Sequence, residues 1–437
     1  MYNECVFLCK VAWIFISEIG RYGFTRDYSK FIDKLSFRLA TINILYVKVF
    51  QAIALNSSFI DENTNNRLLK YTDNAPWTEK DIDMNLLHQV TSENGLIIKE
   101  GFEQPINSGM ISIVFKVFRQ TTDEPVILKM KRCNVDSTLS EAIANLVFFV
   151  NLLNAIPAVK GLDFSAIIHN NVDIIQHQTD FLKEVENMTM FREKCKHLKY
   201  VKIPKVYPDV TSAHSDCILM EYIEGCKINQ VEDEDYEQFA KYHIKSVIAC
   251  ALIHGIVHGD LHGGNLLFIK DETDKKYKYK IGVIDYGIVY RFNDKQRTEA
   301  FDFITELTST SAEITAQRVI QMGIVEPIDV FVNLPKEHYD AIVRIMTGIL
   351  HDTLFVLKRA DCKRIFTSVK ILNDYLNTHN LKQYGIAPSK GFVIFQLTIA
   401  MLYGVIITLC KNDARLLELF DESVTELFRP NIIMNDL

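Results

Sequence analysis

His258-Gly259-Asp260-Leu261-His262-Gly263-Gly264-Asn265 is followed by Asp285-Tyr286-Gly287, and this pairing of motifs decides the fold. An aspartate, an asparagine five residues further on and a second Asp-aromatic-Gly group are the side chains that phosphoryl transfer uses. We predict that Asp260 is catalytic and that Asn265 and Asp285 bind Mg²⁺ bridging the phosphates of ATP. A glycine- and histidine-rich turn beside an unrelated Asp-Tyr-Gly is the alternative, and the joint spacing disfavours it.

The segment between the two motifs predicts a β-hairpin. Two apolar runs, 266–269 and 279–284, flank a charged turn at 271–276. In such a hairpin the start of the first strand lies beside the end of the second. Asn265 and Asp285 would therefore converge on one metal ion.

Composition excludes several classes of protein. The chain has 437 residues, 48% of them hydrophobic, which is enough for two or three domains with a substantial core. A formal net charge of -7 and a pI near 6.0 argue against a nucleic-acid partner. The nine cysteines are scattered, with no spacing typical of zinc sites or disulfide frameworks, and this indicates reduced thiols in a cytosol-like compartment.

The sequence predicts no signal peptide and no clear mitochondrial transit peptide. Lys10 interrupts the first apolar run, and the arginine- and serine-rich character of a transit peptide is missing. Residues 391–410 are uncharged and just long enough to span a bilayer, but their polar side chains favour a buried helix. We expect a cytoplasmic protein, or one in peripheral contact with a membrane, rather than an integral one.

Periodicity predicts the order of elements along the chain. A helical region covers residues 5–55, and helices 139–155, 176–195 and 236–254 precede mainly helical sequence after Asn293. Strands are predicted at 96–99, 111–117, 126–130, 203–207 and 217–222, with a turn at 121–124. We predict an α+β, protein-kinase-like fold with a helical extension over 1–95, a β-rich lobe over 96–225 and a helical lobe over 226–437.

Other side chains complete the predicted nucleotide site. Lys129, in an apolar strand, is placed like the lysine that contacts ATP α/β-phosphates, and such a lysine needs a carboxylate partner. Asp180 and Glu184 share one face of a predicted helix, and we select Glu184 as that partner. Glu221 lies in the segment predicted to meet the adenine through backbone groups.

The loop predicted to cover the phosphates is unusual. It contains Asn107, Ser108 and Gly109, and so has one glycine where protein kinases use three. After Asp285-Tyr286-Gly287 only a few residues precede a helix capped by Asn293, and no Ala-Pro-Glu follows. This leaves no room for a peptide-docking activation segment and disfavours protein phosphorylation.

Together these motifs resemble the UbiB family of atypical kinases, also called aarF-domain-containing kinases. The family's Lys-x-Gly-Gln signature is similar to Lys48-Val49-Phe50-Gln51, with Phe50 in place of glycine, and its Asp-x-x-Pro segment to Asp73-Asn74-Ala75-Pro76. Its Glu-x-Asp group is similar to Gln178-Thr179-Asp180, in which the first acid is lost. The resemblance implies that the helix with Lys48 and Gln51 folds over the nucleotide site.

We therefore expect an atypical kinase that binds ATP and Mg²⁺ and acts as an ATPase or as a phosphotransferase on a small-molecule or lipid substrate. The resemblance implies a role in isoprenoid-quinone or lipid metabolism at a membrane. A small-molecule kinase of the aminoglycoside or choline kinase type is one alternative, since the motif around Asp260 suits that group equally well. A nucleotide-sensing scaffold without catalysis is the other.

Overall fold

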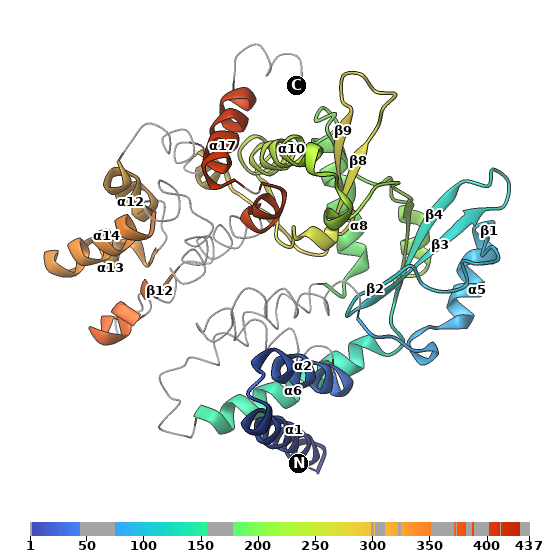
Figure 1. Cartoon of the computed structure of the whole chain (residues 1–437), viewed down its shortest axis with the longest axis horizontal. Coiled ribbons are helices and arrows are strands. Elements are labelled where there is room, and N and C mark those ends of the chain that lie inside the picture. The colour runs from blue at the N-terminus through green and yellow to red at the C-terminus, as the bar shows by residue number, and fades with distance from the viewer. Residues whose placement is uncertain are drawn as a thin grey trace. The chain divides into compact units, whose positions relative to one another are not determined.

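The computed structural model describes residues 2–43, 75–154, 178–298, 301, 311–321, 325–350, 371–372, 374–381, 387–388, 402–410 and 412–428 (Figure 1). The chain divides into two compact units. The first comprises Met1–Val185 and Val206–Tyr222, and the second Glu186–Lys205 and Ile223–Leu437.

An antiparallel sheet is the centre of the first unit. Its strands are β1 (Leu96–Ile97), β2 (Asn107–Ser108), β3 (Ser112–Arg119), β4 (Pro125–Lys131) and β6 (Cys217–Glu221). They are ordered β1-β3-β4-β6, and β2 pairs with β3. β3 and β4 form the long hairpin in Figure 1, and Asp123 has the left-handed φ of 61° in the turn between them. The strands predicted near these positions and the turn at 121–124 are confirmed.

Apolar and charged side chains alternate along the strands, so one face of the sheet packs in the core and the other carries the charged side chains. Phe115 and Val117 of β3 and Leu128 of β4 are buried in one apolar cluster with residues of α5 (Met84–Glu93) and α9 (Pro208–Ala213). Because successive strand residues point to opposite faces, Lys129 lies on the face away from this cluster.

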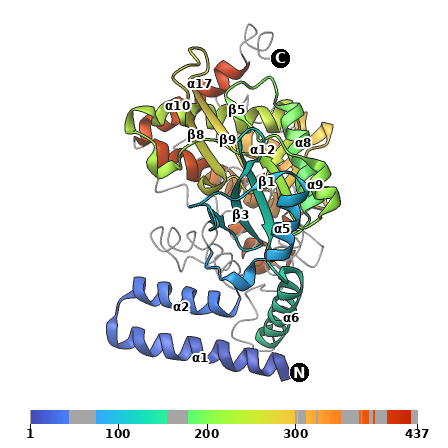
Figure 2. The ribbon, with the colours of Figure 1, turned by 90° about the vertical axis from the view of Figure 1, so that its right-hand side faces the viewer.

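Two long helices begin the chain, as predicted for this region. α1 (Tyr2–Thr25) and α2 (Tyr28–Ile42) lie side by side, and α6 (Val135–Asn154) contacts α1 (Figure 2). Asp27 caps α2, because its carboxylate accepts a hydrogen bond from the Lys30 backbone N–H at 3.0 Å. Residues 44–74, which complete the predicted helical region, lie outside the described part of the chain.

The second unit contains the predicted hairpin. β8 (Leu266–Lys270) and β9 (Tyr279–Val283) pair antiparallel, and β5 (Val201–Lys202) joins β9 in parallel. β7 (Ile256–His258) pairs with β10 (Val289–Arg291). α10 (Tyr236–Ile248) packs against β9 and against α17 (Asp413–Phe428).

Several predicted boundaries are wrong. No strand forms at 203–207, where Val206 makes only an isolated bridge to Met220. The strand β5 precedes this range and ends at Lys202, because Pro204 has no backbone N–H to donate to a ladder. The helix expected at 236–254 is α10 followed by a π-turn at Ala249–Ile253, and Gly255 closes it with a φ of 63°. The helix α8 (Phe181–Lys194) begins later than predicted, since Asp180 caps it by accepting from the Lys183 N–H.

The remaining named elements are short 3₁₀ turns, further helices and one pair of short antiparallel strands. They are η1 (Glu79–Asp81), η3 (Ile228–Gln230), η4 (Asp233–Asp235), η6 (Gly263–Asn265), α12 (Ala312–Gln321), α13 (Ile328–Val332), α14 (Lys336–Leu350), β11 (Val325–Glu326) and β12 (Ala387–Pro388). Among the helices described, none is both long and apolar enough to cross a membrane. Residues 391–401 of the predicted apolar helix lie outside the described ranges.

Candidate active site

In the first unit, Lys129 and Glu184 form a buried ion pair. The Lys129 ammonium donates to Glu184 Oε1 at 2.7 Å and to Oε2 at 2.9 Å. Their side chains are 8% and 1% exposed. β4 delivers the lysine and the first turn of α8 the glutamate, and the contact is the one that the sequence predicts. Its part in phosphate binding stays a prediction.

An arginine that no sequence pattern marks, Arg132, holds the predicted phosphate loop. Arg132 follows β4 and donates to the Gly109 carbonyl at 2.9 Å, the Ser108 hydroxyl at 2.6 Å and the Pro76 carbonyl at 3.0 Å. It also pairs with Asp81 at 3.2 Å. Burial lowers the pKa of Arg132, while Asp81 opposes that shift. The Ser108 hydroxyl therefore binds the Arg132 guanidinium, which is a structural contact within the protein.

Some of the other residues predicted to bind the nucleotide lie in described strands, and others lie outside the described part of the chain. Asn107 and Ser108 form β2, and the Gly109 N–H donates to the Ser112 carbonyl at 2.8 Å, which closes a tight hairpin to β3. Glu221 ends β6 opposite Val126 of β4. Lys48 and Gln51 lie outside the described residues.

In the second unit, the hairpin register brings the two predicted metal ligands to one place. Leu266 pairs with Val283, and the Ile284 N–H donates to the Asn265 carbonyl at 3.1 Å. Asn265 and Asp285 therefore flank the end of the ladder, as the sequence predicts. Asn265 Nδ2 donates to the Asp260 carbonyl at 2.8 Å, which leaves its Oδ1 as the atom suited to a metal.

His258 links the backbones of the two aspartates. The Asp260 N–H donates to His258 Nδ1 at 3.1 Å, so the proton of the neutral ring is on Nε2. That Nε2–H donates to the Asp285 carbonyl at 2.5 Å. Burial lowers the pKa of His258, although the Asp285 contacts oppose the shift. One neutral imidazole thus fixes the spacing of both backbone segments.

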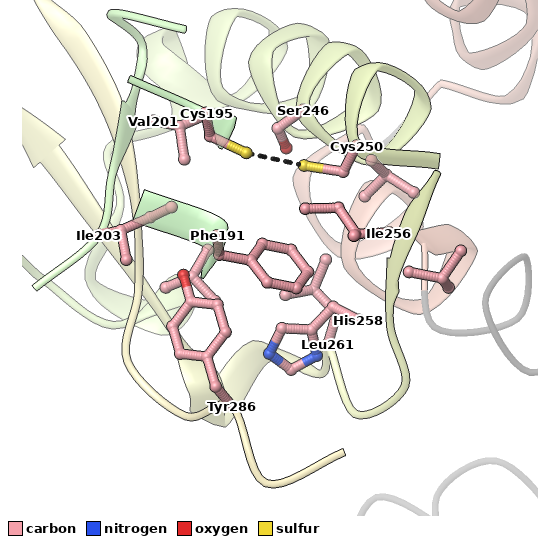
Figure 3. Close-up of a pocket in the computed structure, with 13 residues that line it drawn as sticks. Phe191, Cys195, Val201, Ile203, Ser246, Cys250, Ile256, His258, Leu261 and Tyr286 are labelled. Atoms are coloured by element: carbon pink, nitrogen blue, oxygen red, sulfur yellow. Dashed lines mark hydrogen bonds between the residues drawn. The ribbon is translucent and has the colours of Figure 1, made fainter. Parts of the chain in front are cut away.

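Aromatic side chains pack against the His258 ring and so support this arrangement. Tyr286 is fully buried, with its ring centroid 5.0 Å from that of Phe191 and 5.3 Å from that of His258. These rings line a small pocket with a volume of about 30 Å³. Figure 3 shows them with the thiol contact between Cys195 and Cys250, which also line the pocket. Asn187 donates to the Tyr286 carbonyl at 3.1 Å. Burial raises the pKa of Tyr286 well above its usual value.

The backbone also comes unusually close to its neighbours at Gly259. A Cβ at this position would lie 2.5 Å from side-chain atoms of both Ile288 and Tyr290. The Gly259 N–H donates to the Ile288 carbonyl at 2.9 Å, which ties the residue before Asp260 to the chain after Asp285. Any side chain here would push the two motifs apart.

The oxygen donors fit a hard cation better than a soft one. Asp285 supplies a carboxylate, whose Oδ1 also accepts from the Gly287 N–H at 3.0 Å, and Asn265 supplies an amide oxygen. One or two protein oxygens completed by phosphates and water are the usual ligand set of Mg²⁺. Within the described residues no group of three or more His, Cys, Asp or Glu is placed to bind a metal.

Three supporting residues were not identified from the sequence. Arg132 and Asn187 act through backbone carbonyls distant in sequence, and no local pattern marks such contacts. His258 stands in the deciding motif, and its place two residues before Asp260 was the one available signal.

The ABC1 atypical kinase-like domain family matches residues 70–319 of the chain. A chloroplastic protein of Arabidopsis thaliana named Activity of BC1 Complex Kinase 8 is 22% identical over 291 residues, which cover 64% of this chain and 37% of that protein. An uncharacterized chloroplastic aarF domain-containing protein kinase of the same plant is 22% identical over 382 residues, 86% of this chain and 50% of that protein. The chain therefore spans half or less of the length of these two relatives.

A solved structure of Rv3197 from Mycobacterium tuberculosis in complex with erythromycin is similar over 87% of this chain and 91% of that one. Its sequence identity is 17% and its TM-score 0.48.

We predict that replacing one partner of the Lys129–Glu184 pair lowers the free energy of unfolding more than replacing both partners does. Lys129→Met leaves a buried carboxylate without its cation and should cost about 3 kcal/mol of unfolding free energy in urea denaturation. Lys129→Met/Glu184→Leu should recover most of that loss, because the uncompensated charge is gone.

The pair of Lys99 and Asp123, whose side chains are 32% and 71% exposed, provides the control for this prediction. Lys99→Met should cost less than about 1 kcal/mol. Equal losses in the Lys129 single and double variants would mean that packing, and not charge, is responsible.

A second prediction concerns the protonation of His258. Because the folded-state pKa of His258 is lowered, its ring should stay neutral as the pH falls below 6.5, where ordinary exposed histidines become protonated. Long-range ¹H–¹⁵N spectra should show a protonated Nε2 and an unprotonated Nδ1, with exposed histidines as the internal reference. A ring protonated on Nδ1 at neutral pH would contradict the two hydrogen bonds described.

Proposed function

Because the chain belongs to the ABC1 atypical kinase-like family, we propose that it binds Mg²⁺-ATP and acts as an ATPase or as a phosphotransferase on a small molecule or lipid. The family match confirms the predicted resemblance to UbiB, or aarF-domain-containing, kinases and the α+β protein-kinase-like fold. The activity itself, its substrate and its cofactors are the proposal.

The observation that carries the proposal is the buried ion pair of Lys129 and Glu184. Removing two charges from water is costly, and a pair of apolar side chains would usually stabilise the same position as well. A charged pair retained in such a place is therefore more typical of a functional site than of a core. In kinases a glutamate on a helix holds a strand lysine in position for the α/β-phosphates.

The second unit supplies the remaining roles. Asp260 orients the attacking hydroxyl or water, while Asn265 and Asp285 would hold the metal. Bound Mg²⁺ would neutralise charge on the phosphates. Asn265 performs a second task, because its amide nitrogen fixes the backbone carbonyl of Asp260.

A small or lipid-linked acceptor suits this chain better than a peptide. The segment after Asp285 passes through β10 within a few residues to a helix that Asn293 caps, since Asn293 and Gln296 each accept from the other's backbone N–H. That capping was predicted, and it leaves no peptide-docking activation segment between Gly287 and the helix. The resemblance to UbiB kinases points to isoprenoid-quinone or lipid metabolism as the context.

We predict that ATP binding requires a divalent cation. Calorimetry should detect ATP binding in Mg²⁺ and a large loss in EDTA, and Asp285→Asn should remove the difference between the two conditions because it removes a metal-binding carboxylate. Asp294→Asn, the same change at a side chain that is 99% exposed, should retain the metal dependence. Equal ATP affinity in Mg²⁺ and EDTA for the wild type would refute the metal assignment.

The same preparation distinguishes an enzyme from a nucleotide-sensing scaffold. Asp260→Asn should keep ATP affinity nearly unchanged and lower ADP release about 100-fold or more, since an orienting base acts in the transition state. A wild-type protein that binds Mg²⁺-ATP without turnover, with or without lipid or phenolic acceptors, would favour the scaffold. A loss confined to KM would contradict the role of Asp260.

A further inference from the structure

One face of α1 is apolar and exposed along most of the helix. Its opposite face is the buried one, where Phe7, Val11 and Ile14 are at most 7% exposed. At 100° per residue, positions 12, 13, 16, 19, 20, 23 and 24 fall on the exposed side, and none of them is charged. Trp13 and Ile16 are 65% exposed, Ile19 56% and Phe24 93%.

We call this cluster of exposed side chains the α1 face. Its members share one side of the helix, whereas isolated apolar residues on a surface would be scattered. From Trp13 to Phe24 it extends about 17 Å along the helix axis. Contiguous exposed apolar patches on proteins usually mark a binding surface for another protein or for a membrane. The charges around the patch distinguish these two occupants.

The border of the α1 face is basic. Lys10 and Arg21 lie along one edge of it, and both are exposed. Glu18, the acidic residue in the described middle of α1, points to the buried side, where its Oε1 accepts from Arg21 at 2.9 Å and from Arg38 at 2.8 Å. Residues 6–43 contain six basic and three acidic side chains, whereas the whole chain has a net charge of -7.

We propose that the α1 face docks on a membrane surface that contains anionic lipids, with α1 lying in the plane of the interface. Aromatic and branched side chains would enter the boundary of headgroups and acyl chains while basic residues at the edge meet the lipid phosphates. A second copy of the chain fits less well, because pairing two such faces would bring their basic borders together. This proposal does not depend on the proposed kinase activity.

The protein carries its own probe for this contact, since Trp13 and Trp77 are its two tryptophans. Trp77 packs against the core of the sheet, and Trp77→Phe leaves Trp13 as the single fluorophore. With vesicles of equal parts phosphatidylcholine and phosphatidylglycerol, the Trp13 emission should shift to the blue and be quenched by lipids with brominated chains. Vesicles of phosphatidylcholine alone should bind more weakly, and high salt should reduce the difference.

Vesicle flotation of the full chain then assigns the contact to this face. Ile16→Ser/Phe24→Ser should lower the partition coefficient about 100-fold, since each side chain buried in the interface contributes roughly tenfold. Phe37→Ser removes a 54% exposed aromatic from α2 and should float like the wild type. Circular dichroism checks that each variant keeps its helices.

Two results would overturn the proposal. One is that the wild type does not float with anionic vesicles, or that Phe37→Ser loses as much binding as the double variant. The other is a blue shift of Trp13 that grows with protein concentration without lipid, together with a dimer in light scattering. That outcome would assign the face to a second copy of the chain.

Discussion

The register of the β8–β9 hairpin is the constraint on which the candidate site depends. Leu266 opposite Val283 places Asn265 and Asp285 at the same end of the ladder. A slip of one residue would turn every side chain of one strand to the other face and separate the two oxygen donors. Phe268 and Ile281 are buried on the same side of this pair of strands, so burial of the hydrophobic core favours the register that the proposed metal site requires.

Hydrogen bonds then convert that register into a fixed site. His258 spans from the Asp260 N–H to the Asp285 carbonyl, and Asn265 bonds the Asp260 carbonyl. These bonds join side chains to backbone groups, and they fix the positions of the two aspartates relative to each other.

The sequence predicted the structure correctly where the functional residues lie in a regular local pattern. The two apolar runs around a charged turn predicted the hairpin, and helical periodicity placed Glu184 on one face of α8, where it meets a lysine 55 residues earlier in the chain. It was less informative where a single residue overrides a pattern. Pro204 ended an apolar run that otherwise reads as a strand, and a π-turn replaced the last predicted turns of α10.

Contacts made by long polar side chains to distant carbonyls could not be predicted at all. Nothing in the sequence around Arg132 distinguishes it from Lys131 beside it, which pairs with the partly exposed Asp216. Such contacts depend on the final position of the backbone, and several elements must be in place before they exist. The same reasoning explains why the α1 face escaped notice, because an apolar helix is expected to be buried until its neighbours are known.

Arg132 also offers a physical reason why the predicted phosphate loop has a single glycine. Glycine-rich loops leave the backbone free to approach phosphates, at the cost of ordering the chain when the ligand binds. Here the loop is held in advance by the guanidinium, which bonds the Gly109 carbonyl and the Ser108 hydroxyl. Asp81 pairs with the same guanidinium at 3.2 Å. A loop already fixed in this way needs fewer glycines, because its conformation is set by contacts from outside and not by its own flexibility.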